Sequence, residues 1–255
     1  MNKKVRLSKS GIEYLDYQWG IFSGCENWAY GICPVPNCWA RSLAYRFPNH
    51  YPDGFNPHYY PEAIDSPKHL KKPSIIGVGW VGDVIGYGLA YKEQIFGTIE
   101  QCPRHTFLFL TKNADQLIKW GKFPENCWVG VTATDRLMWF NAIWQLQDIK
   151  ATVKFLSFEP LLKWQHLEKE PIDTVSFTAD WFRRAGISWL IIGAQTKPTV
   201  YPKIEWVEEI VRACDKAGVK VFLKDNLLGM DLPYNDMFFP YECPGSRHLR
   251  QEMPK

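Results

Sequence analysis

The chain has 255 residues, of which 46% are hydrophobic and 15% aromatic, and its formal net charge is +3 at pH 7. This length suits one α/β barrel, so we expect a single domain over 1–255, and the mild charge argues against a dedicated nucleic-acid binder. Because no run of eighteen apolar residues occurs and no apolar segment follows the charged start, we expect a cytoplasmic protein rather than a membrane or secreted one.

The most informative stretch is a cysteine-rich loop that follows a predicted strand at 17–23. Three of the seven cysteines, Cys25, Cys33 and Cys38, lie within fourteen residues in the spacing C-x7-C-x4-C. Apolar residues then recur at helical spacing, which indicates that Cys38 opens a helix. The amino-terminal amides of such a helix would favour a negatively charged group beside the last cysteine.

Three neighbouring thiols have few uses. A structural zinc site needs four ligands, and His50 or His58 would have to supply the fourth. A disulfide framework would require an even set of cysteines in a secreted chain, which is not evident here. An iron-sulfur cluster held by three cysteines would leave one iron open to an outside ligand. On the residues alone, both the zinc and the iron-sulfur interpretation stay open.

The chain after the loop alternates between apolar runs and amphipathic segments. Apolar runs that end in polar or small residues predict strands at 74–80, 105–110, 127–131, 152–156, 188–192 and 219–223. Amphipathic segments predict helices at 92–102, 136–147 and 204–217. The alternation favours a complete or partial TIM-type barrel of about six to seven parallel strands, with the cysteine loop after the first strand. The loops after the strands then carry the chemistry.

Two segments lack periodicity. Residues 47–67 are rich in Pro, Asn, His and Tyr, which predicts a loop insertion, either a lid beside the cysteines or a plain surface loop. Residues 231–255 predict an irregular carboxyl-terminal tail that closes one end of the barrel through Phe238, Phe239 and Tyr241 and frays at its last residues.

A set of short motifs runs in a fixed order through nearly the whole chain. Its members are Gly11–Trp19, Gly24-Cys25, Cys38-Trp39-Ala40, Val81–Val84, Leu110–Lys112, Trp128–Thr132, Leu156–Leu161, Ile192-Gly193 and Phe222–Lys224. This set resembles the phage-type three-cysteine proteins, a family of the radical S-adenosylmethionine superfamily. The cysteine spacing here is longer than the C-x3-C-x2-C that is usual in the superfamily.

The resemblance implies a set of cofactors and ligands for them. Cys25, Cys33 and Cys38 would hold a 4Fe-4S cluster, and S-adenosyl-L-methionine would bind its fourth iron. Trp39 would lie near the adenine, and Asp83 would accept hydrogen bonds from the methionine ammonium group or, alternatively, cap the next helix. Further cofactor contacts would come from Thr111, Lys112, Thr132 and Ser157, with Thr134 and Asp135 as possible ribose contacts, and for all of these a cap or loop role is the competing interpretation.

The remaining strand-end residues are candidates for substrate and catalysis. Glu159 and Lys112 are the catalytic candidates, and an inward-pointing Lys112 would need a partner such as Glu159 or Asp83. Gly82 stands where the family commonly has serine, and Gln195 where it often has an acidic residue. The candidate substrate contacts are Glu159, Gln195, Lys224, Asp225 and Asn226.

We carry three hypotheses for function. The first is a radical enzyme acting on a small heterocycle, with carbon-nitrogen cleavage of queuine to a 7-aminomethyl-7-deazaguanine as the first candidate reaction and flavodoxin or ferredoxin as electron donor. The second keeps the cofactor but has nucleic acid as substrate, which would need a Lys/Arg track that the sequence offers only as scattered groups. The third is a zinc-binding interaction protein without catalytic activity.

Overall fold

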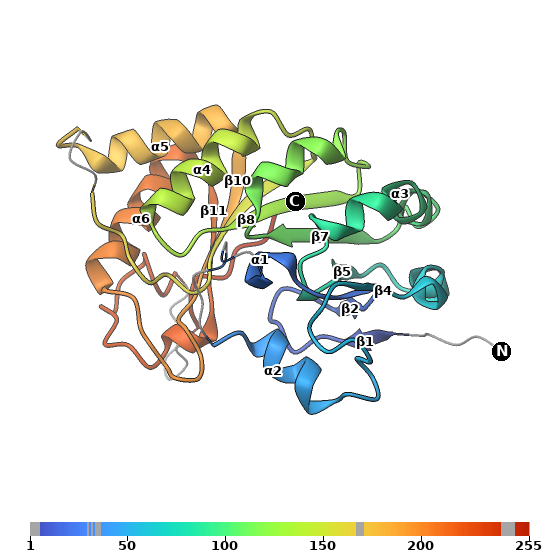
Figure 1. Cartoon of the computed structure of the whole chain (residues 1–255). Helices are drawn as coiled ribbons and strands as arrows, with labels where there is room; N and C mark the ends of the chain where they lie inside the picture. The colour runs from blue at the N-terminus through green and yellow to red at the C-terminus, as the bar shows by residue number, and fades with distance from the viewer. Residues whose placement is uncertain are drawn as a thin grey trace. The chain divides into compact units, whose positions relative to one another are not determined.

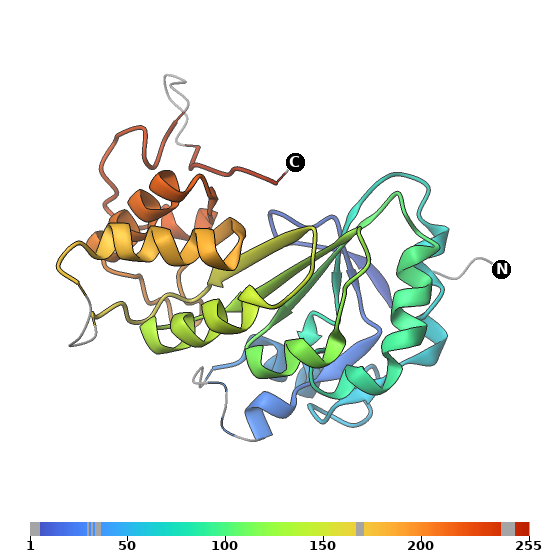
Figure 2. The same ribbon diagram turned by 90° about the horizontal axis from the view of Figure 1, so that it is seen from above.

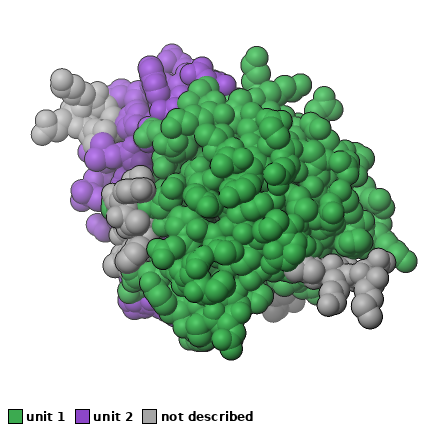
Figure 3. Space-filling model, turned by 45° about the vertical axis from the view of Figure 1, so that its right-hand side comes forward, with its two compact units in different colours: residues 1–131, 149–152 green, residues 132–148, 153–255 purple. Residues whose placement is uncertain are grey.

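The computed structural model describes residues 6–29, 31, 33, 37–166, 171–240 and 248–254 (Figure 1). The chain divides into two compact units, coloured in Figure 3. Unit 1 comprises residues 1–131 and 149–152, and unit 2 comprises residues 132–148 and 153–255. Among the described residues, no helix combines the length and apolar character needed to span a lipid bilayer.

Unit 1 contains a mostly parallel sheet with the strand order β1-β2-β5-β7-β8. Strand β1 is antiparallel to β2, and the pairs from β2 onward are parallel. β7 reads Thr-Phe-Leu-Phe-Leu-Thr and is buried along nearly its whole length, as expected for a parallel strand covered on both faces. The strands are β1 (Leu7–Lys9), β2 (Tyr17–Trp19), β5 (Ile75–Val78), β7 (Thr106–Thr111) and β8 (Cys127–Thr132).

A second, three-stranded sheet of unit 1 leads into the cysteine loop. Its order is β4-β3-β6, with β3 (Phe22–Gly24) antiparallel to β4 (His58–Tyr59) and parallel to β6 (Val81–Gly82). The α-helices of this unit are α1 (Glu26–Ala29), α2 (Trp39–Arg46) and α3 (Lys92–Glu100). Short 3-10 helices occur at Pro61–Ala63, Ser66–His69, Tyr87–Tyr91 and Ala114–Trp120.

Unit 2 contains three parallel strands in the order β9-β10-β11 and three longer helices. The helices lie side by side, with α5 between α4 and α6 (Figures 1 and 2). Asp135 and Asp173 start α4 and α5 by accepting backbone N–H groups of Met138 and Ser176, each at 2.9 Å. The elements are β9 (Val153–Phe158), β10 (Ile187–Ile192), β11 (Lys220–Leu223), α4 (Arg136–Gln147), α5 (Thr174–Ala185), α6 (Ile204–Ala217) and a 3-10 turn at Asp225–Leu227.

The two faces of the unit 2 strands differ. One face lies under the helices, because Lys154 Nζ donates to the carbonyl of Leu146 at the end of α4. The other face carries a layer of rings in which Trp189 contacts Phe155 and Phe222, with centroid distances of 5.3 and 6.1 Å. Since side chains alternate along a strand, residues two positions further on project from this second face, called the inner face below.

The tail of unit 2 is irregular, yet it is attached to the strands. Gln251 forms an isolated bridge with Phe222, and Trp189 Nε1 donates to the carbonyl of Glu252 at 2.8 Å. Phe238 and Phe239 are buried, whereas Tyr241 lies outside the described residues, so that closure of a barrel end by these rings stays a prediction. The expected fraying is wrong for residues 250–252, because the Leu223 N–H donates to the carbonyl of Arg250, the Glu252 N–H donates to the carbonyl of Val221, and Gln251 bridges to Phe222.

The predicted α/β class with parallel strands is confirmed. Four parallel strands in unit 1 (β2, β5, β7 and β8) and three in unit 2 (β9, β10 and β11) give the predicted number of about seven. The predicted helices at 136–147 and 204–217 coincide with α4 and α6, and that at 92–102 corresponds to α3. Closure into a barrel and organisation as a single domain both stay predictions.

The single strand predicted at 17–23 is wrong, because it forms two strands in different sheets. The chain breaks at Gly20, whose N–H donates to the carbonyl of Arg6 at 2.7 Å. The cysteine loop therefore follows β3 of the small sheet rather than a strand of the larger one. Within 47–67, strand β4 pairs with β3, so part of the predicted insertion supports the element that precedes Cys25.

Candidate functional site

The cysteine loop of unit 1 holds three half-buried cysteines that form no disulfide with the described residues. Cys25 follows β3 directly, and its N–H donates to the carbonyl of Phe55 at 3.2 Å. The N–H of Cys33 donates to the carbonyl of Asn27 at 3.1 Å, and Cys38 is the N-cap residue of α2, as predicted. Backbone contacts of the described residues thus fix the chain at each of the three positions.

Two of the thiols have a common apolar neighbourhood. Cys25 and Cys38 pack against one cluster of buried residues, made of Ala40, Ala44, Tyr51, Phe55 and Val81. Since Cys25 comes from the end of β3 and Cys38 from the start of α2, this packing brings together positions that are thirteen residues apart in the sequence. Within the described part of the chain, however, no three His, Cys, Asp or Glu side chains are arranged so that they could hold a metal ion.

Two glycines set the close approach of backbone strands beside Cys25. Gly24 and Gly82 are register partners in the parallel pair β3 and β6, and their φ angles are 81° and 156°. A Cβ at Gly82 would lie 2.0 Å from the carbonyl oxygen of Gly24, and one at Gly24 would lie 2.1 Å from that of Asn56. No side chain fits at either position, which accounts for the absence of a serine at residue 82.

Asp83 is the centre of a group called the Asp83 cluster, which comprises Asn27, Asp83, Ile85, Thr111 and Lys112. Asp83 Oδ2 accepts hydrogen bonds from Asn27 Nδ2 at 2.5 Å, Thr111 Oγ1 at 2.7 Å and the Lys112 N–H at 3.0 Å. Oδ1 accepts one from the N–H of Ile85 at 3.1 Å. The carboxylate therefore ties α1 and the end of β7 to the turn after β6.

Burial raises the pKa of Asp83, although the hydrogen bonds from Thr111, Lys112 and Ile85 act against that rise. Lys112 joins the cluster through its backbone N–H, while its half-buried side chain adds only a Coulombic contribution that lowers the pKa of Asp83. The sequence analysis missed Asn27; the signal available was its place within the cysteine loop, two residues after Cys25. Trp39, expected near an adenine, is 51% exposed at the start of α2.

The two histidines considered for a zinc site contact other groups. His50 Nε2 lies 3.2 Å from Arg6 Nη1, and its pKa is lowered by burial and by the Arg6 charge. His58 Nδ1 pairs with the Asp53 carboxylate. Neither histidine belongs to a metal-ligand group with the cysteines among the described residues.

In unit 2, Glu159 and Lys224 form an ion pair at the carboxyl ends of β9 and β11. The distance from Lys224 Nζ to Glu159 Oε1 is 2.5 Å, and the two side chains are 10% and 26% exposed. Glu159 thus has a salt-bridge partner within its own unit. Of the two partners named for Lys112, Asp83 is the one whose pKa the Lys112 charge affects. Gly193, after β10, lies between the two chains: a Cβ there would be 3.2 Å from both Glu159 Cγ and Lys224 Cδ.

The other predicted substrate contacts are engaged with the protein itself. Asn226 accepts the N–H of Ala194 and donates to its carbonyl, both at 3.0 Å. Gln195 donates to the carbonyl of Pro198 at 3.1 Å within its own turn. Asp225 is exposed and accepts a hydrogen bond from Gln251 of the tail at 2.8 Å. These three residues support loops at the strand ends.

The predicted cofactor contacts at the start of unit 2 differ in what they bind. Asp135 caps α4, which is the competing interpretation for that residue, and Thr134 Oγ1 lies 3.2 Å from Met138 Sδ. Thr132 is buried in β8. Ser157 is 1% exposed, and its hydroxyl has no hydrogen-bond partner among the described residues.

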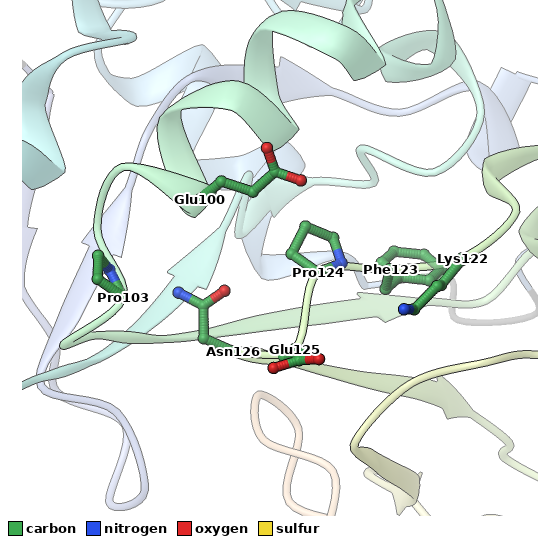
Figure 4. A pocket seen from close by; sticks show the side chains of 7 residues that line it. All are labelled: Glu100, Pro103, Lys122, Phe123, Pro124, Glu125 and Asn126. Carbon is green, nitrogen blue, oxygen red and sulfur yellow. The ribbon is translucent and has the colours of Figure 1, made fainter.

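A pocket of about 640 Å3 lies elsewhere in unit 1, between the end of α3 and the start of β8 (Figure 4). The Asn126 side chain donates to the carbonyls of Ile99, Cys102 and His105 at 3.0–3.2 Å, so it supports the surrounding chain. None of the predicted site residues lines this pocket. It is lined by Glu100, Pro103, Lys122, Phe123, Pro124, Glu125 and Asn126.

Comparison with known proteins gives one match. The model of a family described as "Protein of unknown function (DUF5131)" matches residues 9–228. No curated protein and no solved structure matches the chain. Because the family match covers most of the sequence, including the cysteine loop and the Asp83 cluster, the chain belongs to the DUF5131 family.

Proposed function

We propose that the chain is a radical S-adenosylmethionine enzyme whose 4Fe-4S cluster is held by Cys25, Cys33 and Cys38. The observation that carries this proposal is the set of three half-buried cysteines within fourteen residues, with Cys25 directly after β3 and Cys38 at the start of α2. When bound, the cluster and S-adenosylmethionine supply one-electron reductive cleavage of the sulfonium to methionine and a 5'-deoxyadenosyl radical.

The chemistry of the three cysteine side chains suits such a group, although the described residues do not show them arranged as a set of metal ligands. Thiolates are the usual protein ligands of iron-sulfur clusters, and three of them leave one iron for an outside ligand. The apolar cluster that packs against Cys25 and Cys38 would limit the access of water. The first amides of α2, which follow Cys38, favour negative charge on a sulfur ligand at that point.

The Asp83 cluster suits a positioning role beside this loop. Asp83 binds Asn27, which in turn accepts the Cys33 N–H through its carbonyl, and the Asp83 N–H donates to Gly24 at 3.2 Å. Asp83 therefore contacts the chain on both sides of Cys25, through its carboxylate at Asn27 and through its backbone N–H at Gly24. We assign Asp83 Oδ1, with a single N–H donor among the described residues, as the acceptor for an ammonium group of the cofactor.

The substrate class belongs to the same proposal. We propose a small heterocycle, with carbon-nitrogen cleavage of queuine as the first reaction to test, and a one-electron donor of the flavodoxin or ferredoxin class. A modest net charge of +3 and an aromatic content of 15% suit a flat, small substrate better than a nucleic acid. Cysteines that form no disulfide suit a reducing compartment, so the cytoplasm stays our expected location.

The test is anaerobic reconstitution with iron and sulfide, followed by dithionite reduction in the presence of S-adenosylmethionine. We expect about four irons per chain, a charge-transfer absorbance that dithionite bleaches, and 5'-deoxyadenosine in the product mixture. A panel of bases and nucleosides that includes queuine identifies the substrate through stimulated 5'-deoxyadenosine formation.

Two variants make the test specific. Cys38→Ala should abolish 5'-deoxyadenosine formation, whereas Cys102→Ala, which removes a buried thiol elsewhere in unit 1, should leave it unchanged. One equivalent of zinc without iron would refute the proposal in favour of a structural zinc protein. Tight binding of DNA or RNA oligomers at low salt would shift the substrate assignment to nucleic acid.

A further inference from the structure

The inner face of unit 2 carries a polar layer above its rings. Phe155 and Phe222 belong to the ring layer around Trp189, and two residues further along their strands come Ser157 and Lys224. By strand alternation these side chains project from the same face. The inner face therefore changes from aromatic to polar toward the carboxyl ends of β9 and β11.

Ser157 contributes a buried hydroxyl without a partner. It is 1% exposed, and its Oγ accepts and donates no hydrogen bond among the described residues. Its backbone is satisfied, because the Ser157 carbonyl accepts the N–H of Ala133 at 3.0 Å. Leaving a buried hydroxyl unpaired is unfavourable, so a retained one requires an explanation such as a ligand.

Glu159 and Lys224 lie beyond Ser157 on this face. Glu159 follows Ser157 by two residues, about 7 Å along an extended chain. The Lys224 side chain extends past the end of β10 to reach the Glu159 carboxylate. It passes Gly193, where a Cβ would lie 3.2 Å from both Glu159 Cγ and Lys224 Cδ. The pair thus places one ammonium and one carboxylate at the strand ends, above the unpaired hydroxyl.

The charge of the pair selects the ligand. An anion that bound the ammonium would bring a second negative group beside Glu159, and a cation that bound the carboxylate would bring a second positive group beside Lys224. A neutral ligand with a donor next to an acceptor can contact both members without adding a charge. A lactam, with its N–H beside a C=O, has this arrangement.

We propose that Ser157, Glu159 and Lys224 form a binding site for a neutral nitrogen heterocycle that carries a lactam. The ring N–H donates to the carboxylate of Glu159, the ring carbonyl accepts from the ammonium of Lys224, and the Ser157 hydroxyl donates to an acceptor on the same ring. Only the statement that this ligand is the substrate rests on the proposed function; the binding itself requires neither cluster nor S-adenosylmethionine.

Calorimetric titration of the full chain, prepared aerobically without iron, tests the site directly. The probes are hypoxanthine, 1-methylhypoxanthine, adenine and inorganic phosphate. We expect hypoxanthine to bind and the other three to bind at least tenfold more weakly, because methylation removes the ring N–H, adenine replaces the carbonyl by an amine and phosphate brings unpaired charge. Equal binding of hypoxanthine and 1-methylhypoxanthine, stronger binding of phosphate, or no binding of hypoxanthine would each overturn the proposal.

Variants separate binding from folding. Ser157→Ala should weaken hypoxanthine binding about fivefold, the loss of one hydrogen bond, while its Tm stays equal to or above that of the wild type because no partner is lost. Lys224→Met should weaken binding more than tenfold, whereas Lys220→Met, an exposed lysine on the same strand, should leave it unchanged. A Ser157→Ala protein that binds as the wild type does, or a Lys220→Met protein that loses binding equally, contradicts the assignment.

Discussion

The Asp83 cluster of unit 1 and the Glu159–Lys224 pair of unit 2 both place a carboxylate at strand ends, yet they differ in what surrounds it. Asp83 accepts four hydrogen bonds from uncharged groups, two of them backbone N–H groups. Glu159 instead faces one ammonium, with an unpaired hydroxyl two residues before it. A carboxylate that accepts hydrogen bonds from several fixed neutral donors holds a loop in place. One that is balanced by a single side chain can exchange that partner for part of a ligand.

The largest expected effect comes from the backbone that supports Asp83. In Gly82→Ala the new Cβ would lie 2.0 Å from the carbonyl oxygen of Gly24. Relieving this clash requires the backbones of β3 and β6 to move apart. We expect a loss of about 4 kcal/mol in the free energy of unfolding, at the upper end for a single substitution. Urea unfolding followed by tryptophan fluorescence measures it. Gly97→Ala, at a glycine of α3 with no atom within 4 Å of the new Cβ, is the control and should not destabilise the protein.

Asp83→Asn should have the next largest effect, about 3 kcal/mol. An asparagine amide presents one donor to a site that contains only donors, so buried N–H and O–H groups around it lose their acceptor. The same variant should reduce iron incorporation during reconstitution, because the Asn27 side chain, two residues after Cys25, loses its carboxylate acceptor. Full iron loading with normal stability would show that the Asp83 cluster does not order the cysteine loop.

The pH dependence of this variant has a definite sign. Because burial raises the pKa of Asp83 above its ordinary value, the folded protein binds this proton more tightly than the unfolded chain does. The resulting stability is fully present below the unfolded pKa and is lost as pH rises through the folded pKa. The stability advantage of the wild type over Asp83→Asn should therefore shrink as the pH rises from below the unfolded pKa of Asp83 through its raised folded pKa. A difference that grows with pH would contradict the raised pKa.

The pKa of Glu252, in the tail, is shifted in the opposite direction from that of Asp83. Burial alone would raise the pKa of Glu252, but the hydrogen bond from the Val221 N–H and the Arg250 guanidinium outweigh burial and lower it. Its contribution is present above the unfolded pKa and is lost as pH falls through the folded pKa. Glu252→Gln should cost about 1 kcal/mol at neutral pH and nothing at strongly acidic pH. Equal cost at both pH values, measured by urea unfolding, would rule out this linkage.

These differences show what the sequence could and could not predict. The strands after the cysteine loop and the helices α4 and α6 were predictable, because long apolar runs and helical periodicity are local signals. The break at Gly20 was not, since it depends on the carbonyl of Arg6 fourteen residues earlier. Similarly, the sequence identifies Glu159 and Lys224 as strand-end residues, but it does not predict that they pair. Their pairing depends on the strand order β9-β10-β11 and on a glycine, Gly193, between the two side chains.

Lys224→Met should lower the free energy of unfolding by about 2 kcal/mol. It removes the ammonium that neutralises the partly buried Glu159, and the partial exposure of Glu159 lets water offset part of the cost. Glu159→Gln leaves the more buried ammonium without its carboxylate and should cost at least as much. If the double variant Glu159→Gln/Lys224→Met is as unstable as the sum of the two single variants, the two side chains are not coupled.

The smallest expected effect is the matched change in unit 1, Lys112→Met. Lys112 contributes its backbone N–H to Asp83, and any residue other than proline supplies that donor. The side chain adds only the weak attraction that lowers the pKa of Asp83, so its removal should cost no more than about 0.5 kcal/mol and raise that pKa further. Urea unfolding of Lys112→Met beside Lys224→Met thus compares two strand-end lysines directly. Equal destabilisation of the two variants would mean that the Lys112 ammonium, and not its peptide group, holds the Asp83 cluster together.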